Sequence, residues 1–334
     1  MLGRIRTIKL KSRPRGLPTT DNFELVEMDM PMAQAGEVLV RLTYFSVDPY
    51  MRNRMNDVKS YIEPYALNEP LSGDAIGEVI ESKSEALLPG DMVTGIFPWQ
   101  EYAVKKASSL RKIESNVLPI TAHLGILGLT GLTAYFGMLD IGCPEKGETV
   151  VVSGAAGAVG QVAGQIAKIK GCKVIGIAGS KQKVDYLQNN LGFDAAINYK
   201  DHRNIRRPLR NVCPKGVDIY FDNVGGEISD NVIYMLNDHA RIVLCGQIAL
   251  YNSSRIEVGP RLNAQFIIHR VRMEGFIVYD YASRYSEAIS RLSRWMKEGR
   301  LQYSENIVEG FDNIIDAFLG LFKGKNLGKQ LVKV

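Results

Sequence analysis

Short stretches in the first third of the chain are rich in β-branched residues or alternate apolar and polar residues. Residues 38–42 and 75–80 are examples, and glycine and proline separate such stretches between about residues 23 and 125. A period of two is typical of strands that bury one face of a sheet. The pattern therefore predicts an all-β domain in this part of the chain.

A different rhythm begins at about residue 147. Residues 148–153 include consecutive valines, the continuous apolar run expected of a strand that is covered on both faces. Residues 160–170 follow with a helical period that places Gln161 and Gln165 on a polar side, and Gly171 ends this helix. Further strands are predicted at residues 173–178, 217–222 and 240–245, and further helices around residues 183–190 and 227–236.

This alternation of strands and helices predicts a doubly wound α/β domain built around a parallel sheet. The domain boundary falls between about residues 120 and 145. We assign residues 1–125 to the β domain and 126–300 to the nucleotide-binding domain. Residues 301–334 are predicted to return to the β domain, with a strand at 330–334.

The composition is that of an ordinary globular protein with about two domains: 334 residues, 46% of them hydrophobic and 23% charged. Residues 1–11 contain no apolar signal-peptide core, and no run of about 18 apolar residues occurs, so we expect a cytoplasmic protein without a membrane partner. The net charge of +5 is modest. The densest basic cluster lacks interleaved aromatic residues and predicts an exposed helix face, so no nucleic-acid partner is expected. It consists of Arg203, Arg206, Arg207 and Arg210.

The cysteines and histidines offer no metal site. The four cysteines, at positions 143, 172, 213 and 245, form no CxxC pair, and the four histidines show no HxxxH or HExxH spacing. We therefore expect reduced, mostly buried thiols and no bound metal.

A glycine-rich turn joins the strand at 148–153 to the helix that follows. Gly154 and Gly157 permit a tight turn and close approach of the backbone to a pyrophosphate, while Gly160 lets the helix pack against the strand. The helix begins near Ala158 and Val159, and its first N–H groups and positive dipole end favour phosphate. The turn therefore predicts dinucleotide binding, the alternative being a glycine-rich turn without a ligand.

The end of the second strand decides between NAD and NADP. An acidic residue about 20 residues beyond the turn would bind the ribose 2′-hydroxyl of NAD. No carboxylate occurs in this region before Asp185, whereas Lys181 and Lys183 are available to a 2′-phosphate. The pattern favours NADPH as the cofactor, unless both lysines are merely solvated residues at a helix start.

Several motifs, in order along nearly the whole chain, resemble a known family. They are VDPYMR at 47–52, GLTAY at 131–135, GAAGAVG at 154–160, FDNVGG at 221–226, CGQI at 245–248 followed by Tyr251-Asn252, and NLGK at 326–329. Together they resemble the zinc-independent medium-chain dehydrogenases/reductases, most closely the leukotriene B4 12-hydroxydehydrogenase/prostaglandin reductase and curcumin-reductase group.

The resemblance implies an α/β fold with a GroES-like β domain, a Rossmann domain, an active site in the cleft between them, and often a homodimer. It implies that Lys183 contacts the 2′-phosphate of NADPH. It further implies that the cofactor or its nicotinamide end is lined by Thr133, Tyr199, Asn223, Cys245, Gly246, Tyr251, Phe276, Val278 and Asn326.

The zinc-containing cousins in this family carry metal ligands that this chain lacks. They have a cysteine in the segment that here spans residues 45–48, and Gly-His-Glu where this chain has Gly73-Asp74-Ala75. A zinc ion acting as Lewis acid is therefore not expected.

Reduction of a conjugated double bond places hydride on the β-carbon and drives negative charge onto the carbonyl oxygen, so the site needs a hydrogen-bond donor at that oxygen. The resemblance places Tyr251 beside the nicotinamide, although by itself the turn would suit an ordinary surface tyrosine. Either Tyr251 or water would then protonate the α-carbon. Tyr50 and Arg52 are predicted to contribute to the substrate side, a packed strand-end tyrosine being the alternative for Tyr50.

These expectations describe an NADPH-dependent reductase of small, lipophilic α,β-unsaturated ketones and aldehydes. Two alternatives remain at this point: an NADPH quinone reductase and a non-catalytic NADPH-binding protein. Oxidation of a hydroxyl group also stays open, because some relatives carry that activity.

Overall fold

The computed structural model describes residues 3–114 and 119–334, which form two compact units. One unit comprises Met1–Gly125, Asn306–Asn326 and Gln330–Val334, and the other comprises Ile126–Glu305 and Leu327–Lys329. Each unit has its own sheet and its own hydrophobic core. Among the described residues, no helix is both long and apolar enough to cross a membrane.

The first unit is a mainly antiparallel β structure with strands in the order β14-β15-β3-β4-β5-β7, with β6 pairing on β3 and a separate β1-β2 hairpin. Its strands are β1 (Arg4–Leu10), β2 (Phe23–Asp29), β3 (Glu37–Ser46), β4 (Ser72–Ser82), β5 (Met92–Pro98), β6 (Tyr102–Lys106), β7 (Arg111–Lys112), β14 (Glu305–Glu309) and β15 (Lys329–Lys333). A single turn of helix, α1 (Met51–Arg54), follows β3.

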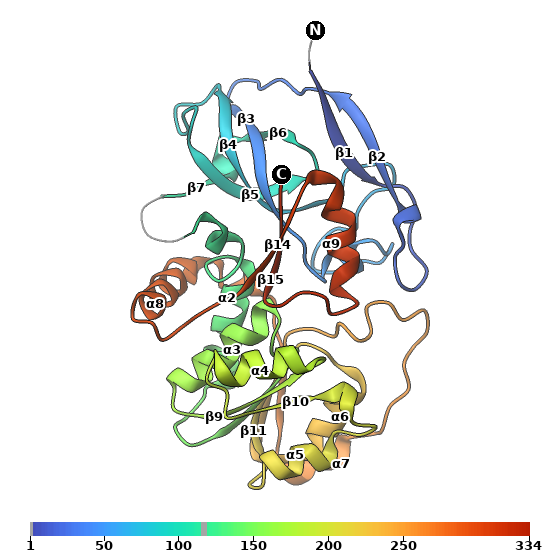
Figure 1. The fold of residues 1–334 in the computed structure, drawn as a ribbon, viewed down its shortest axis with the longest axis vertical. Helices are drawn as coiled ribbons and strands as arrows, with labels where there is room; N and C mark the ends of the chain where they lie inside the picture. The colour runs from blue at the N-terminus through green and yellow to red at the C-terminus, as the bar shows by residue number, and fades with distance from the viewer. Residues whose placement is uncertain (1–2, 115–118) are drawn as a thin grey trace. The chain divides into compact units, whose positions relative to one another are not determined.

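The C-terminal segment completes the core of this first unit. Strand β15 pairs with β3, with Leu331 opposite Ser46, and helix α9 (Ile314–Leu321) lies in the same unit. Figure 1 shows these last, red elements beside the blue and cyan strands of the same unit. The ring of Phe318 packs edge-on against Trp99, with centroids 6.1 Å apart. Residues 306–326 and 330–334 thus belong to the same compact unit as the N-terminal strands.

The second unit contains a six-stranded parallel sheet with the order β10-β9-β8-β11-β12-β13, in which the strand order reverses between β8 and β11. This order is that of a Rossmann domain, and ligands bind such sheets at the reversal, outside the carboxyl ends of the strands. The strands are β8 (Thr149–Ser153), β9 (Lys173–Ala178), β10 (Ala195–Asn198), β11 (Val217–Asp222), β12 (Leu236–Leu244) and β13 (Arg272–Gly275). The predicted α/β fold with a doubly wound parallel sheet is confirmed.

Helices connect these strands and cover the sheet. They are α2 (Leu129–Phe136), α3 (Ala158–Ile169), α4 (Lys181–Asn189), α5 (Arg206–Val212), α6 (Gly226–Ile233), α7 (Asn263–His269) and α8 (Tyr285–Lys297). Right-handed crossovers place α3 and α4 on one face of the sheet and α5, α6 and α7 on the other, while α2 and α8 pack on the α3 side. Strand β8 is consequently buried along its whole length, which explains its continuous apolar run.

Two helix faces differ from their predicted character. Gln161 and Gln165 are almost fully buried, because their side chains bond to the backbone of residues 302–304, which covers this side of α3. In the arginine cluster, Arg206 is half-buried: its guanidinium lies 4.0 Å from the ring centroid of Tyr234 and donates to Asn231. In both places the segment that covers the helix face is distant in the sequence.

Candidate active site

The glycine turn lies at the carboxyl end of β8, beside the reversal of strand order. Gly154 has φ +58°, a left-handed conformation that favours glycine. Gly157 occupies the N-cap position of α3, and its N–H donates to Gly154 O at 3.0 Å. The N-cap residue supplies no side-chain cap to α3. The first turn of this helix is therefore suited to bind an anion.

Gly160 brings α3 against the turn. A Cβ atom at this position would lie 2.4 Å from Gly154 O and 2.7 Å from Ala155 Cα, so only glycine fits without a shift of the backbone. This contact confirms the predicted role of Gly160 in packing. Ala158 and Val159, which begin α3, are partly exposed.

The start of α4 separates the two candidate lysines. Ser180 caps this helix by accepting a hydrogen bond from Lys183 N at 3.3 Å. Lys181 is exposed and paired with Asp185 at 2.6 Å, whereas Lys183 is half-buried. Burial, and next the positive charge of Lys200, lower the pKa of Lys183. A phosphate dianion would stabilise the charged ammonium and so offset both effects on its pKa. Lys183 is therefore the better of the two candidates for binding a 2′-phosphate.

Tyr199 lies against the end of the second strand. A Cβ atom on Gly179 would come within 2.9 Å of the Tyr199 ring, so glycine there leaves space for the aromatic ring. The Lys200 Nζ lies 6.0 Å from the centroid of the same ring. Lys200 is a positive group of this region that the sequence analysis did not single out.

Asp222, at the carboxyl end of β11, is the centre of a hydrogen-bond network at the carboxyl edge of the parallel sheet. Its carboxylate accepts hydrogen bonds from Ser153 Oγ (2.9 Å) and Tyr220 (2.8 Å), from the Ser229 hydroxyl, and from the backbone N–H groups of residues 224 and 225. Asn223 then donates its side-chain amide to Ser153 O at 2.8 Å. This network joins β8, β11 and the turn after β11, and fixes the position of Asn223.

The segment after β12 folds over Asn223. The backbone N–H groups of Cys245 and Gly246 both donate to Asp222 O, and a Cβ on Gly246 would lie 3.2 Å from the Tyr251 hydroxyl oxygen. That oxygen accepts a hydrogen bond from Gln247 N at 3.4 Å. The structure thus brings Asn223, Gly246 and Tyr251 together. Burial raises the pKa of the Cys245 thiol to about 12, so the thiol is protonated at neutral pH.

Three further predicted cofactor residues of this unit have identified neighbours. The Thr133 hydroxyl donates to Leu129 O within α2, and the Val278 carbonyl accepts a hydrogen bond from the Tyr285 hydroxyl. The ring of Phe276 comes within 2.7 Å of the Cβ position of Gly137, so glycine in that position leaves room for it. None of these contacts by itself points to a cofactor.

Tyr50, Arg52 and Asn326 belong to the first unit. Tyr50 is partly buried against the core of that unit. Arg52 is almost fully buried, and its guanidinium donates to Pro14 O, Gly16 O and the side chain of Asn56. These bonds hold the loop at residues 14–16, and a contribution of Arg52 to the substrate side stays a prediction. The sequence carries no signal for these bonds, because the loop is distant along the chain.

The positions that carry zinc ligands in the zinc-containing cousins hold other groups here. Ser46 Oγ donates to the carboxylate of Asp48, and Asp74 and Ala75 lie within β4. Within residues 3–114 and 119–334, no group of three or more His, Cys, Asp or Glu side chains is arranged to hold a metal ion.

Comparisons with known proteins cover both units. Residues 6–113 match the N-terminal domain of oxidoreductase, and residues 158–294 match the model described as zinc-binding dehydrogenase. The chain is 56% identical to the protein YfmJ of Bacillus subtilis, over 98% of this chain and 97% of that protein. It is 41% identical to the NADPH-dependent curcumin reductase of Escherichia coli, over 97% and 95%.

A solved structure extends this similarity to three dimensions. CurA of Vibrio vulnificus in complex with NADPH superposes with a TM-score of 0.94 at 43% sequence identity, covering 98% of this chain and 99% of CurA. Fold, glycine turn and sequence similarity agree. The chain belongs to the medium-chain dehydrogenases/reductases, in the group of the curcumin and prostaglandin reductases.

Proposed function

We propose that this protein is an enzyme that uses NADPH to reduce the carbon–carbon double bond of α,β-unsaturated ketones and aldehydes. The observation that carries the proposal is the glycine turn at 154–160, packed against α3, in a chain that is 41% identical to a curcumin reductase and 39% identical to a 2-alkenal reductase. The alternative of a non-catalytic nucleotide-binding module gains no support from these relatives.

The residues of the second unit fit NADPH. The uncapped start of α3 suits the pyrophosphate, with Gly154, Gly157 and the first helical residues around it. Lys183, with Tyr199 close to the same strand end, suits the 2′-phosphate. Asn223 is held rigidly by Ser153, and it suits a polar contact with the cofactor. We assign cofactor contacts also to Thr133, Cys245, Gly246, Phe276, Val278 and Asn326, following the family.

NADPH, when bound, supplies the hydride that the substrate receives at its β-carbon. The protein must then stabilise the negative charge that moves to the carbonyl oxygen. Tyr251 is our candidate donor for this oxygen. Its phenol oxygen accepts a hydrogen bond from Gln247 N, and a hydroxyl that accepts a bond becomes a stronger donor. A proton from Tyr251 or from water completes the reduction at the α-carbon.

We propose that this chemistry needs no metal. The segment 45–48, where the zinc-containing cousins carry a cysteine, has none, and Asp74 and Ala75 stand in place of histidine and glutamate. The cysteine and histidine ligands that zinc prefers are therefore missing at these positions. Tyr251 therefore takes the place of a Lewis acid at the carbonyl oxygen.

We propose a homodimer formed through the free edge of the parallel sheet. Strand β13 ends the strand order, and all four of its residues are exposed. Ile267 and Ile268 on the neighbouring α7 are 76% and 57% exposed. Pairing of two copies of β13 would satisfy the edge hydrogen bonds and cover these side chains. Size-exclusion chromatography with light scattering tests this.

The experiment that tests the function is a screen of NADPH consumption over enals, enones, quinones and nitroalkenes. We expect the highest kcat/KM with an enone or enal, together with a product saturated at the α,β bond. A preference for quinones would replace the proposal with a quinone reductase. Absence of turnover with all four classes, despite tight NADPH binding, would favour the non-catalytic alternative.

Tyr50 remains our candidate for a residue that contacts the substrate.

A further inference from the structure

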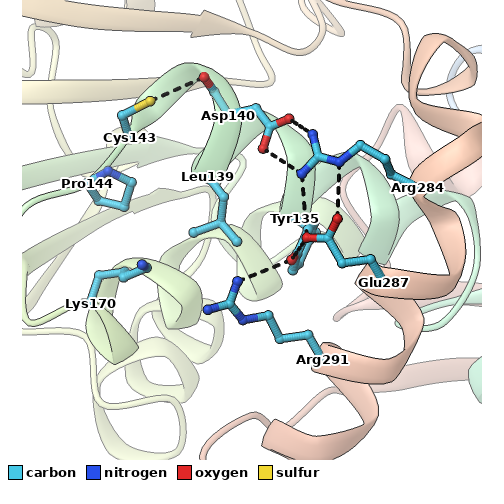
Figure 2. Close-up of a pocket in the computed structure, with 9 residues that line it drawn as sticks. All are labelled: Tyr135, Leu139, Asp140, Cys143, Pro144, Lys170, Arg284, Glu287 and Arg291. Atoms are coloured by element: carbon cyan, nitrogen blue, oxygen red, sulfur yellow. Dashed lines mark hydrogen bonds and ion pairs between the residues drawn. The ribbon is translucent and has the colours of Figure 1, made fainter.

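A hollow of about 370 Å³ lies in the second unit, away from the glycine turn. It is bounded by the end of α3, by residues 139–144 and by the first turns of α8 (Figure 2). Its volume falls in the range of small-molecule sites. The NADPH binding and reduction that we propose at the carboxyl edge of the sheet do not involve this hollow.

The hollow belongs to the opposite edge of the parallel sheet. Cys143 and Pro144 precede β8, and Lys170 follows α3 and precedes β9, so all three lie near the amino ends of the strands. Helix α3 has 12 residues and is therefore about 18 Å long, which separates Lys170 by about that distance from the glycine turn. A ligand in the hollow cannot be the pyrophosphate bound at the start of α3.

Positive charge exceeds negative charge in the hollow. Arg284 is compensated twice: it forms ion pairs with Asp140 and with Glu287. Lys170 and Arg291 form no ion pair with any described residue. The hollow thus contains three cations against two carboxylates, a net charge of +1. The Glu287 carboxylate acts on Arg291 as well as on Arg284, whereas Lys170 has no carboxylate partner among the described residues.

Arg291 also carries an unused donor. Its Nη1 donates to the Tyr135 hydroxyl at 3.4 Å, and that hydroxyl donates to Glu287 at 2.9 Å. Its Nε is buried and has no hydrogen-bond partner among the described residues. A buried donor without a partner is costly, so a ligand that accepts from it gains affinity. Tyr135 meanwhile holds the guanidinium in place.

Figure 2 shows the Lys170 ammonium and the Arg291 guanidinium directed toward the same space, below the side chain of Leu139 and beside Pro144. We propose that this hollow binds a phosphate group, as the free ion or as the monoester of a small organic molecule. A tetrahedral dianion has enough oxygens to accept from the Lys170 ammonium and from the Arg291 guanidinium at once. Leu139 and Pro144 provide an apolar wall for the carbon part of a monoester.

The test measures binding of inorganic phosphate and of phenyl phosphate by calorimetry, in low-salt buffer, to protein saturated with NADPH so that the nucleotide site is filled. We expect both probes to bind, and replacement of Lys170→Gln or Arg291→Gln to weaken binding by at least about tenfold. Lys297→Gln is the matched control, because Lys297 is exposed on the same helix as Arg291 and does not line the hollow. NADPH affinity should be unchanged in all three variants.

A gain-of-affinity variant guards against misfolding as an explanation. Glu287→Gln keeps an oxygen that accepts from Tyr135 but removes a negative charge beside Arg291, so phosphate should bind about threefold tighter or better. Tighter binding of phenyl phosphate than of inorganic phosphate identifies a monoester site, and equal binding identifies a site for the free ion. The proposal is overturned if neither probe binds the NADPH-saturated protein, or if Lys170→Gln and Arg291→Gln bind them as wild type does.

Discussion

Replacement of Gly160 by alanine tests whether the contact between α3 and the glycine turn shapes the nucleotide site. The new Cβ would lie 2.4 Å from Gly154 O and 2.7 Å from Ala155 Cα, whereas ordinary contacts of such an atom begin at 3.4 Å. Both neighbours are backbone atoms of the turn itself, so no flexible side chain can yield. The helix and the turn must therefore separate by up to about 1 Å.

The magnitude follows from two opposing effects. Overpacking of this kind costs about 1–3 kcal/mol, while the better helix propensity of alanine returns about 1 kcal/mol. We expect a net loss of up to about 2 kcal/mol in the free energy of unfolding, equivalent to up to about 8 °C in Tm for a domain of this size. Displaced N–H groups at the start of α3 should also weaken NADPH binding by at least about tenfold.

The assay combines thermal unfolding of the ligand-free protein with fluorescence titration by NADPH. Gly320→Ala is the matched control: this glycine is also buried in a helix, but its nearest neighbour is Lys325 Cδ at 3.5 Å, an ordinary contact. We expect Gly320→Ala to leave NADPH affinity unchanged and to keep Tm or raise it by a few degrees, because the better helix propensity of alanine is not opposed by a close contact there. If Gly160→Ala also has wild-type Tm and NADPH affinity, the close packing of α3 is not required for the site.

Four further predictions address the cofactor and the chemistry. Lys183→Glu should erode the preference for NADPH over NADH, measured as the ratio of dissociation constants; equal use of both cofactors by the wild type would refute the assignment. The pKa of Lys183 is lowered, and its positive charge is lost as pH rises through that pKa. NADPH affinity should therefore begin to fall at a lower pH than it would with an ordinary lysine. Lys183→Gln, which carries no charge at any pH, should flatten this profile. Tyr251→Phe should lower kcat for a simple enone by at least about tenfold and leave NADPH affinity unchanged. Loss of one oxyanion donor typically lowers kcat about 100- to 1,000-fold, and a second donor would make the loss smaller. An unchanged kcat would move the role to another donor, and Tyr50 would be tested next. Activity should survive prolonged treatment with a chelator, and stoichiometric zinc whose removal abolishes activity would overturn the metal-free mechanism.

The second unit was largely predictable, because its strands carry their signal locally. The predicted strands at 173–178 and 217–222 coincide with β9 and β11, and α3 ends before Gly171, whose φ is +84°. Both faces of the inner strands are covered, so β8, β9 and β11 consist mostly of apolar residues. The predicted helix at 227–236 was too long: α6 ends at Ile233, because Leu236 already pairs with Val217.

Side chains that act through distant partners were assigned less well. Gln161 and Gln165 have the polarity of a solvent-facing row, but residues 302–304 cover them. Arg52 stands in a motif of the family, yet its guanidinium is used by the backbone of residues 14–16. A periodicity analysis compares neighbours within one turn or one strand, and it contains no information about a segment that arrives from far along the chain.

The sequence by itself determined the α/β class, the parallel sheet, the glycine turn and the preference for a 2′-phosphate, because each depends on residue types at short spacing. Tertiary structure alone decided how the site is held together. Asp222 gathers Ser153, Tyr220 and Ser229 from two strands and a helix around one buried carboxylate, and so positions Asn223. The packing of the whole chain also placed the positive charges of Lys170 and Arg291 around one hollow. Burial and charge balance depend on which segments meet in space, and that is settled only when the whole chain packs.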